Sequence, residues 1–212
     1  MITVIDYGSG NLRSVAKALE KVGGNQVTVS GKPEDLMNAD RLLLPGVGAF
    51  ADCLQNLQKA ELDEPILEHI RKGKPFLGIC VGMQLLFSRS FEFGEHNGLD
   101  LLAGDVLAFK KDMTDPLDQS RHLKVPHMGW SPVQQQQEHP MWDGIPDATH
   151  FYFVHSFYAK PNDEKLTVGA ADYGMRFCAA VSHENLFATQ FHPEKSQAHG
   201  LKLLENFVTW RA

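Results

Sequence analysis

The 212-residue sequence predicts an α/β fold: a mostly parallel central sheet with helices on both faces and additional antiparallel strands in the C-terminal half. Two observations lead to this prediction. The first ninety residues alternate short apolar stretches with amphipathic ones, the pattern of a parallel sheet covered by helices. From about Leu101 onward, short strand-like stretches are separated by polar turns, which favours antiparallel pairing.

The elements of the first half are expected in alternation. Residues 2–6 form an apolar strand, and five apolar residues then recur at helical spacing and mark one buried helix face: Leu12, Val15, Ala16, Leu19 and Val22. We next expect a strand over 26–30, a helix over 33–38, a strand over 41–44, helices over 51–59 and 62–72, a strand over 74–79 and a helix over 81–88.

The second half is predicted to consist mainly of strands. They are expected over 101–109, 131–135, 150–158, 165–171, 177–182 and 186–191, followed by a helix over 197–210. The chain shows no internal repeat and no linker long enough to divide it, so residues 1–212 are expected to form a single domain.

Composition argues against several functional classes. With 43% hydrophobic residues the chain can bury a full core, and its net charge of −6 argues against binding nucleic acid or an anionic membrane. No apolar run approaches the roughly 18 residues that a membrane-spanning helix needs. The chain begins directly as a strand, without a secretory signal, so we expect a cytoplasmic protein.

Cysteine and histidine usage argues against disulfide and metal chemistry. The three cysteines, Cys53, Cys80 and Cys178, include no C-x-x-C pair, and the ten histidines include no H-E-x-x-H motif. We therefore expect no metal and no cofactor, and structural roles for Cys53 and Cys178.

Cys80 stands between an expected buried strand and an expected helix, with Gly78 and Gly82 on either side. A nucleophile on such a sharp turn is presented to a substrate, and the glycines let the backbone bend and the substrate approach. The first N–H groups of the helix favour a thiolate. From this segment alone, a buried structural cysteine remains equally open.

A histidine and a carboxylate follow the last expected strand, at His192 and Glu194. Pro193 between them ends the strand and lets both side chains project from its end. A base must reach the thiol and a carboxylate must orient the imidazole, so Cys80, His192 and Glu194 could form a triad assembled by folding.

Two glycine-containing turns accompany these motifs. Pro45-Gly-Val-Gly48 offers backbone N–H groups, at Val47 and Gly48, that could join the N–H of Val81 in an oxyanion hole, although an ordinary turn is the alternative. Gly8-Ser-Gly10 is interpreted as a tight strand–helix turn rather than a dinucleotide fingerprint, because Arg13 replaces the third glycine. Asn11 is expected to cap the helix that follows.

PGVG, GICVGMQ and FHPE, in this order, resemble the class I glutamine amidotransferases, which use a Cys–His–Glu triad. The opening DYGSGNL, PHMGW over 126–130, YFVHS over 152–156 and the ending FHPEKS resemble the glutaminase subunits of imidazole glycerol phosphate synthase, from histidine biosynthesis. The resemblance covers essentially the whole chain. It implies that Cys80 is the nucleophile, His192 the base and then the acid, and Glu194 its orienting partner.

The resemblance also implies a glutamine site. Gln84 would hold the amino-acid end of the substrate, Glu92 would bind the α-amino group, and Gly48 would add a backbone contact. The α-carboxylate would be held by the main chain at His155, Ser156 and Phe157. Without the family resemblance, Gln84 would be interpreted as a solvated helix residue and Glu92 as a surface charge.

A partner is implied as well: a (β/α)8-barrel cyclase subunit that receives the ammonia and makes imidazole glycerol phosphate and an aminoimidazole carboxamide ribonucleotide. The contact and ammonia passage would involve four residues: Pro126, Met128, Trp130 and Tyr152. Ser131 departs from the G-W-N that the family commonly has. If the oxyanion N–H of the PGVG loop is misdirected at rest, nucleotide on the partner could turn it toward the site.

Three other functions share these motifs. The triad could serve a stand-alone cysteine γ-glutamyl hydrolase, or the chain could be the glutaminase subunit of another synthase, such as the one for anthranilate. It could also be a binding or regulatory subunit without catalysis, although the presence of all three triad residues argues against that.

Overall fold

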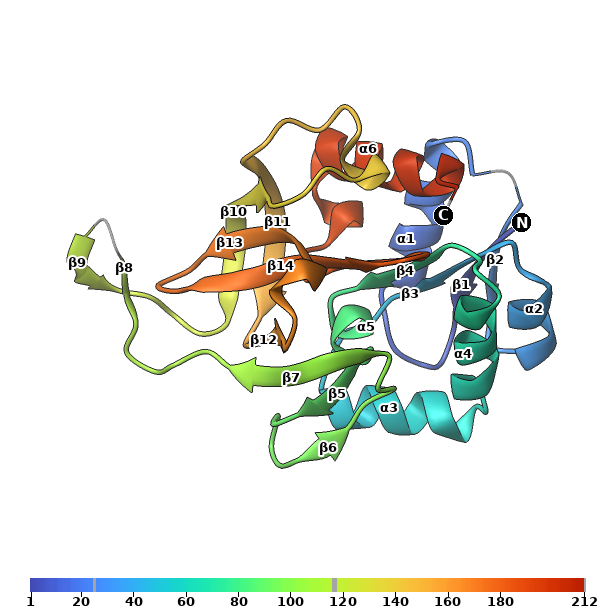
Figure 1. Cartoon of the computed structure of the whole chain (residues 1–212), viewed down its shortest axis with the longest axis horizontal. Helices are drawn as coiled ribbons and strands as arrows, with labels where there is room; N and C mark the ends of the chain where they lie inside the picture. The colour runs from blue at the N-terminus through green and yellow to red at the C-terminus, as the bar shows by residue number, and fades with distance from the viewer. Residues whose placement is uncertain (25, 116–117, 212) are drawn as a thin grey trace.

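The computed structural model describes residues 1–24, 26–115 and 118–211, and a nine-stranded sheet forms its centre (Figure 1). The strand order is β11-β10-β13-β14-β15-β4-β3-β1-β2. From β15 to β2 neighbouring strands pair in parallel, and from β15 to β11 they pair in antiparallel fashion. The predicted α/β fold is confirmed, and the expected antiparallel strands extend the same sheet.

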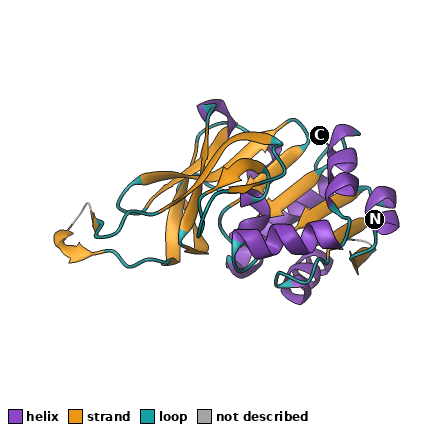
Figure 2. Ribbon diagram, turned by 90° about the horizontal axis from the view of Figure 1, so that it is seen from below, coloured by secondary structure: helices purple, strands orange, loops and turns teal. Residues whose placement is uncertain are grey.

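The parallel half is short-stranded and apolar. It consists of β1 (Ile2–Ile5), β2 (Val27–Ser30), β3 (Arg41–Leu44), β4 (Phe76–Ile79) and β15 (Leu186–Thr189). Helices lie on both sides of these strands (Figure 2): α1 (Leu12–Lys21), α2 (Pro33–Asn38), α3 (Phe50–Lys59), α4 (Asp63–Arg71) and α6 (Gln197–Thr209). Because both faces are covered, β1, β4 and β15 are buried along their whole length.

The antiparallel half and a second sheet lie beyond β15. The remaining strands of the large sheet are β10 (His127–Gln135), β11 (Thr149–His155), β13 (Thr167–Asp172) and β14 (Arg176–His183). The four-stranded sheet contains β12 (Phe157–Pro161), β7 (Leu102–Ala108), β5 (Phe87–Ser90) and β6 (His96–Asn97). A hairpin of β8 (Thr114–Asp115) and β9 (Asp118–His122) projects from the body in Figure 1. The described residues also include three single-turn 3-10 helices, at Pro140–Trp142, Glu164–Leu166 and Pro193–Lys195.

Several expectations about elements were wrong. The helix expected over 81–88 is only α5 (Val81–Gln84), because Phe87 and Ser88 belong to β5, which pairs with β7. The strand expected over 150–158 divides at Ser156 into β11 and β12, which belong to different sheets. Asn11 precedes α1 but makes no side-chain capping hydrogen bond. The misplaced strands depend on pairing with distant segments, which local sequence does not reveal.

The core carries an aromatic cluster beneath the end of β15. The rings of Phe151 and Phe191 stack with centroids 4.1 Å apart, and Trp142 and Phe153 border them. Phe191 is fully buried, and its packing fixes the position of the residue that follows it, His192.

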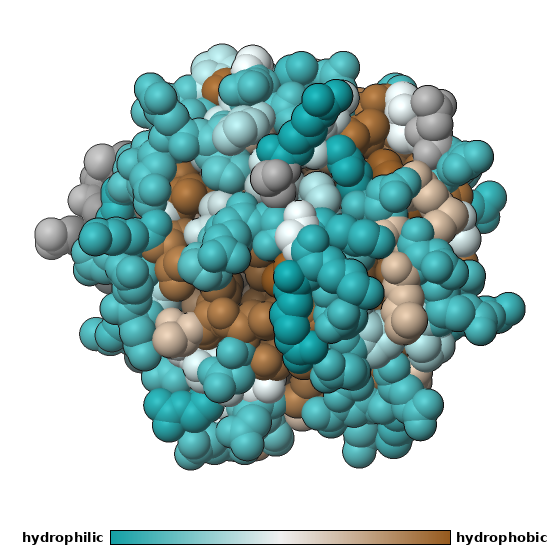
Figure 3. Space-filling model, turned by 45° about the vertical axis from the view of Figure 1, so that its right-hand side comes forward, coloured by the Kyte–Doolittle hydropathy of each residue, from teal (hydrophilic) through white to brown (hydrophobic). Residues whose placement is uncertain are grey.

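The face of the molecule shown in Figure 3 is mainly hydrophilic, and apolar residues gather there in recesses between polar ones. Among the described residues, no helix combines the length and the apolar character needed to cross a membrane.

The turn after β4 is packed so tightly that glycine is required there. A Cβ at Gly82 would collide with the carbonyl oxygen of Leu44 on β3, and one at Gly46 would lie 2.7 Å from the backbone nitrogen of Gly82. The loop after β3 therefore lies in backbone contact with the turn that carries Cys80.

We predict that Gly82→Ala lowers the free energy of unfolding by ~3 kcal/mol or more, because backbone atoms cannot yield to the new methyl group. Gly73→Ala is the matched control: Gly73 has φ +71° but open space around it, so only backbone strain of about 1–2 kcal/mol is expected. Urea denaturation measures both. Equal losses in the two variants would contradict the packing argument.

Candidate active site

Cys80 lies at the point where β4 ends and α5 begins, in a backbone conformation that a side chain rarely adopts (φ +56°, ψ −113°). The hydrogen bond from its N–H to Thr189 O, 2.7 Å long, joins the ends of β4 and β15. Its carbonyl accepts from the N–H groups of Met83 and Gln84, which begins the helical turn. The strained conformation is held by backbone bonds on both sides and turns the sulfur toward a cavity.

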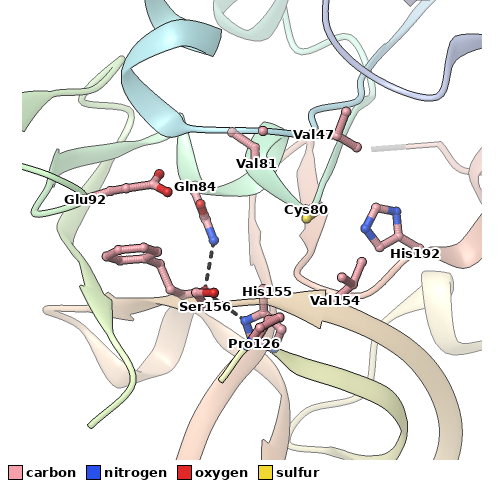
Figure 4. A pocket seen from close by; sticks show the side chains of 12 residues that line it. Val47, Cys80, Val81, Gln84, Glu92, Pro126, Val154, His155, Ser156 and His192 are labelled. Atoms are coloured by element: carbon pink, nitrogen blue, oxygen red, sulfur yellow. Dashed lines mark hydrogen bonds between the residues drawn. The ribbon is translucent and has the colours of Figure 1, made fainter. Parts of the chain in front are cut away.

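His192 reaches the same cavity from the end of the neighbouring strand, and Glu194 lies behind it, outside the cavity lining. His192 Nδ1 lies 2.9 Å from Glu194 Oε1, and both side chains are buried. Because a carboxylate accepts, Nδ1 carries a proton and Nε2 faces the sulfur. Within the described part of the chain, Nε2 is buried and makes no hydrogen bond, and Cys80 lies beside the ring in Figure 4.

The protonation of His192 is governed by its two neighbours. Burial by itself lowers the pKa of His192, but the neighbouring Cys80 sulfur and the hydrogen-bonded Glu194 carboxylate outweigh it and raise that pKa to about 9. At neutral pH the arrangement therefore favours an imidazolium between a sulfur and a carboxylate. Such a group is placed to give a proton to a leaving group bound at Cys80.

The cavity has a volume of about 310 Å³, at the small end of the range for ligand sites. In Figure 4, Cys80 and His192 lie at one end, and Gln84, Glu92 and Ser156 lie toward the other. The lining residues predicted from sequence are Val47, Gly48, Cys80, Val81, Gln84, Glu92, Pro126, His155, Ser156, Phe157 and His192, and Val154 joins them. Met128, Trp130 and Tyr152 do not line it.

The polar residues opposite the sulfur are held by specific bonds. Gln84 Nε2 donates to Phe157 O at 3.1 Å and to Gln190 Oε1 at 2.9 Å, so its oxygen is the atom left for a ligand. Glu92 Oε2 accepts from the N–H of Phe50, the first residue of α3, at 2.7 Å. Burial raises the pKa of Glu92. The other carboxylate oxygen can accept from an ammonium group.

Two of the expected oxyanion donors, the N–H groups of Val81 and Val47, point in different directions. The N–H of Val81 opens α5 and has no intrahelical acceptor, and Val81 lines the cavity. The N–H of Val47 instead donates to Ser9 Oγ at 3.5 Å, and Ser9 does not line the cavity. Gly48 has φ +100° and open space around it, so the loop has room to turn.

Of the four residues expected at a partner contact, Pro126 lines the cavity, and Met128 and Trp130 line the groove next to it. Pro126 lines both the cavity and a neighbouring groove along β10. Met128 and Trp130 are 63% and 45% exposed, which is unusual for large apolar side chains side by side on one strand face. The ring of Tyr152 lies 6.0 Å from that of Trp130, and Lys195 lies over it.

One residue beside the sulfur was not identified from the sequence, and another was given the wrong surroundings. Gln190, fully buried, directs Nε2 toward Cys80 Sγ at 3.7 Å. Its position within the strand that leads to His192 is the signal that could have identified it. Ser131, expected to affect the partner contact, instead turns inward and donates to His127. Among the described residues, no group of three or more His, Cys, Asp or Glu side chains could hold a metal ion.

Comparison with known proteins identifies the family of the chain. The model of the family "Glutamine amidotransferase class-I" matches residues 3–210. A protein of Syntrophotalea carbinolica is 51% identical over 98% of both chains, and one of Geobacter metallireducens is 50% identical over 100% of this chain and 99% of its own. Both are named imidazole glycerol phosphate synthase subunit HisH.

Solved structures share the fold at low identity. A crystal structure of a glutamine amidotransferase has a TM-score of 0.72 at 17% identity, covering 98% of this chain and 97% of its own. PurLQS from Thermotoga maritima has a TM-score of 0.73 at 20% identity, covering 98% and 96%.

The chain therefore belongs to the class I glutamine amidotransferase family, enzymes that hydrolyse glutamine. Within the family it groups with the HisH subunits of imidazole glycerol phosphate synthase, as its near-full-length identity of about 50% to them shows. The family expected from the sequence motifs is confirmed.

Because Glu194 helps to raise the pKa of His192, the substitution Glu194→Gln is expected to lower that pKa. The imidazolium is then lost at lower pH, so the alkaline limb of the pH profile of kcat/KM moves from near 9 to lower pH. The maximal rate is expected to fall at least ~10-fold. Glu138→Gln, at an exposed position, is the control. An unchanged alkaline limb and rate would show that Glu194 does not act on His192.

Proposed function

We propose that Cys80, His192 and Glu194 hydrolyse glutamine through a cysteinyl thioester, as the glutaminase subunit of imidazole glycerol phosphate synthase. The observation that carries this proposal is the meeting of a strained cysteine and a buried His–Glu pair at one cavity. We further propose that residues 1–212 act as a single glutaminase domain in the cytoplasm.

The reaction has two halves. The Cys80 thiolate attacks the side-chain amide carbon, and when the C–N bond breaks, the His192 imidazolium gives its proton to the departing ammonia. His192 then takes a proton from water as the water attacks the thioester, and glutamate leaves as Cys80 regains its thiolate. Two easier steps replace one difficult hydrolysis.

The cavity suits a glutamine whose amide carbonyl faces Cys80. Its ammonium group would meet the Glu92 carboxylate and the Gln84 oxygen, and its α-carboxylate would meet the main chain between His155 and Phe157. At Ser156 the backbone passes from β11 in the large sheet to β12 in the four-stranded sheet. Backbone groups at this turn therefore lie outside the strand pairing of both sheets.

We propose that the partner is a (β/α)8-barrel cyclase subunit that binds over Met128, Trp130 and Tyr152. The exposed aromatic and methionine side chains have the composition of an interface centre. Pro126, which lines both the cavity and the groove beside it, marks where ammonia would pass.

The resting loop supports a gated site. Ser9 Oγ donates to Val47 O at 2.5 Å, and Cys53 Sγ donates to the same oxygen at 3.4 Å. Together with the bond from Val47 N–H to Ser9, these contacts hold the Val47 backbone toward Ser9 rather than toward the sulfur. Docking of the partner with its nucleotide would turn this backbone and complete the oxyanion hole.

The function is tested by measuring glutamate release from glutamine by the chain alone, with the cyclase, and with cyclase and nucleotide. We expect a low rate that rises strongly only in the full mixture and disappears in Cys80→Ala. A high rate without the partner would indicate a stand-alone hydrolase. Indifference to the barrel would indicate another synthase's subunit, and activity in Cys80→Ala would overturn the mechanism.

Gating is tested by Ser9→Ala. Removing the hydroxyl frees the Val47 N–H and leaves only the Cys53 thiol on the Val47 carbonyl. The rate of the chain without its partner should therefore rise about 3- to 10-fold while the fully stimulated rate stays the same. Ser14→Ala, on the next helix, is the control. An unstimulated rate that is unchanged or lower in a folded Ser9→Ala protein would show that Ser9 does not hold the loop in its resting conformation.

A further inference from the structure

The Gln190 side chain is the innermost polar group beside the sulfur. Its Oε1 accepts from Gln84 Nε2 at 2.9 Å, and its Nε2 therefore faces Cys80 Sγ at 3.7 Å. The orientation of the amide is fixed by Gln84, whose nitrogen also donates to the carbonyl of Phe157 and so cannot be exchanged with its oxygen. Gln190 thus directs a donor to the nucleophile without touching the rest of the cavity, which it does not line.

The Phe157 carbonyl continues this series of bonds outward. It accepts from His155 Nδ1 at 2.8 Å, so His155 Nε2 is the acceptor nitrogen. His127 Nδ1 donates to it at 3.0 Å, and His127 Nε2 in turn accepts from the Ser131 hydroxyl at 2.9 Å. Burial lowers the pKa of His127 to about 4 and, with smaller opposing effects, that of His155 to about 3, so both rings are neutral links.

The outer end of this series lies on β10, the strand that presents Met128 and Trp130 to the surface. Successive strand residues point to opposite faces, so His127 and Ser131 point inward while Met128 and Trp130 point outward. The same strand thus carries the proposed partner contact on one face and the start of a buried hydrogen-bond chain on the other.

We propose that Gln190 is a positioning residue for Cys80 and that a buried series of hydrogen bonds, the relay, connects the sulfur to β10. The relay runs through Ser131, His127, His155, the Phe157 carbonyl, Gln84 and Gln190. The proposal rests on the glutaminase function proposed above and adds the residues that connect the partner-facing strand to the nucleophile. The side chains of the series are buried, and its donors and acceptors are paired with one another, so a change at one end alters the geometry at the other.

The first test replaces the donor. Gln190→Met removes the N–H to sulfur at similar volume, and Gln190→Glu keeps an oxygen acceptor for Gln84 but loses the N–H. In the complex with cyclase and nucleotide, both variants should lower kcat for glutamine hydrolysis about tenfold or more. KM should change less than about twofold, because Gln190 does not touch the amino-acid end of the substrate.

Gln55→Met, at an exposed position on α3, is the matched control and should behave as wild type. Wild type and Cys80→Ala are measured in parallel. If wild type is active, Cys80→Ala is inactive and both Gln190 variants keep the wild-type kcat, the positioning proposal fails while the proposed function stands. A change in KM alone would also overturn it.

The second test asks whether Ser131 acts through Gln190. Ser131→Ala should lower kcat about threefold in the wild-type background, and Ser131→Thr, which keeps the hydroxyl, should restore it. In the Gln190→Met background, Ser131→Ala should have no further effect, because the relay is already broken. Effects that multiply in the double variant, or no effect of Ser131→Ala alone, would show that the relay does not exist.

Discussion

The site depends on the parallel pairing of β4 with β15, and in particular on the hydrogen bond from Cys80 N–H to Thr189 O. This bond joins two strand ends that are far apart in the sequence, so Cys80 emerges from one and Gln190 and His192 from the next. The tight backbone packing of Gly46 and Gly82 then leaves the cysteine turn no freedom to relax. A nucleophile held in a strained conformation this way needs little reorganisation before it reacts.

Burial acts in opposite directions on the histidines of the site. His192 has a carboxylate and a sulfur as neighbours, and its pKa rises despite burial. His127 and His155 hydrogen-bond to each other and to neutral groups, and burial, joined at His155 by the charge of His192, lowers their pKa. One region of the protein therefore contains a histidine suited to giving up a proton and two that are suited only to holding hydrogen bonds. The environment, rather than the residue type, separates acid–base chemistry from positioning.

Much of the fold could be predicted because its signals are local. The alternation of apolar strands and amphipathic helices up to β4 appears directly in residue spacing, and the bounds of β3 agree to the residue. The short α5 and the division at Ser156 could not be predicted, because both result from pairing in the four-stranded sheet. The triad followed from the motifs around Cys80 and His192, whereas Gln84, Glu92 and the 155–157 main chain followed from the family resemblance. Gln190 and Ser9 did not, because their importance lies in contacts that exist only after folding.

The most direct test of the account is covalent labelling with a chloromethyl ketone analogue of glutamine. Such a reagent alkylates a thiolate that lies against the position of the substrate's side-chain carbonyl. Peptide mapping by mass spectrometry should find one label per chain, on Cys80, with glutamine protecting it and Cys53 and Cys178 unmodified. Labelling of Cys53 or Cys178 in preference to Cys80, or labelling of Cys80 that glutamine does not slow, would contradict the proposed site.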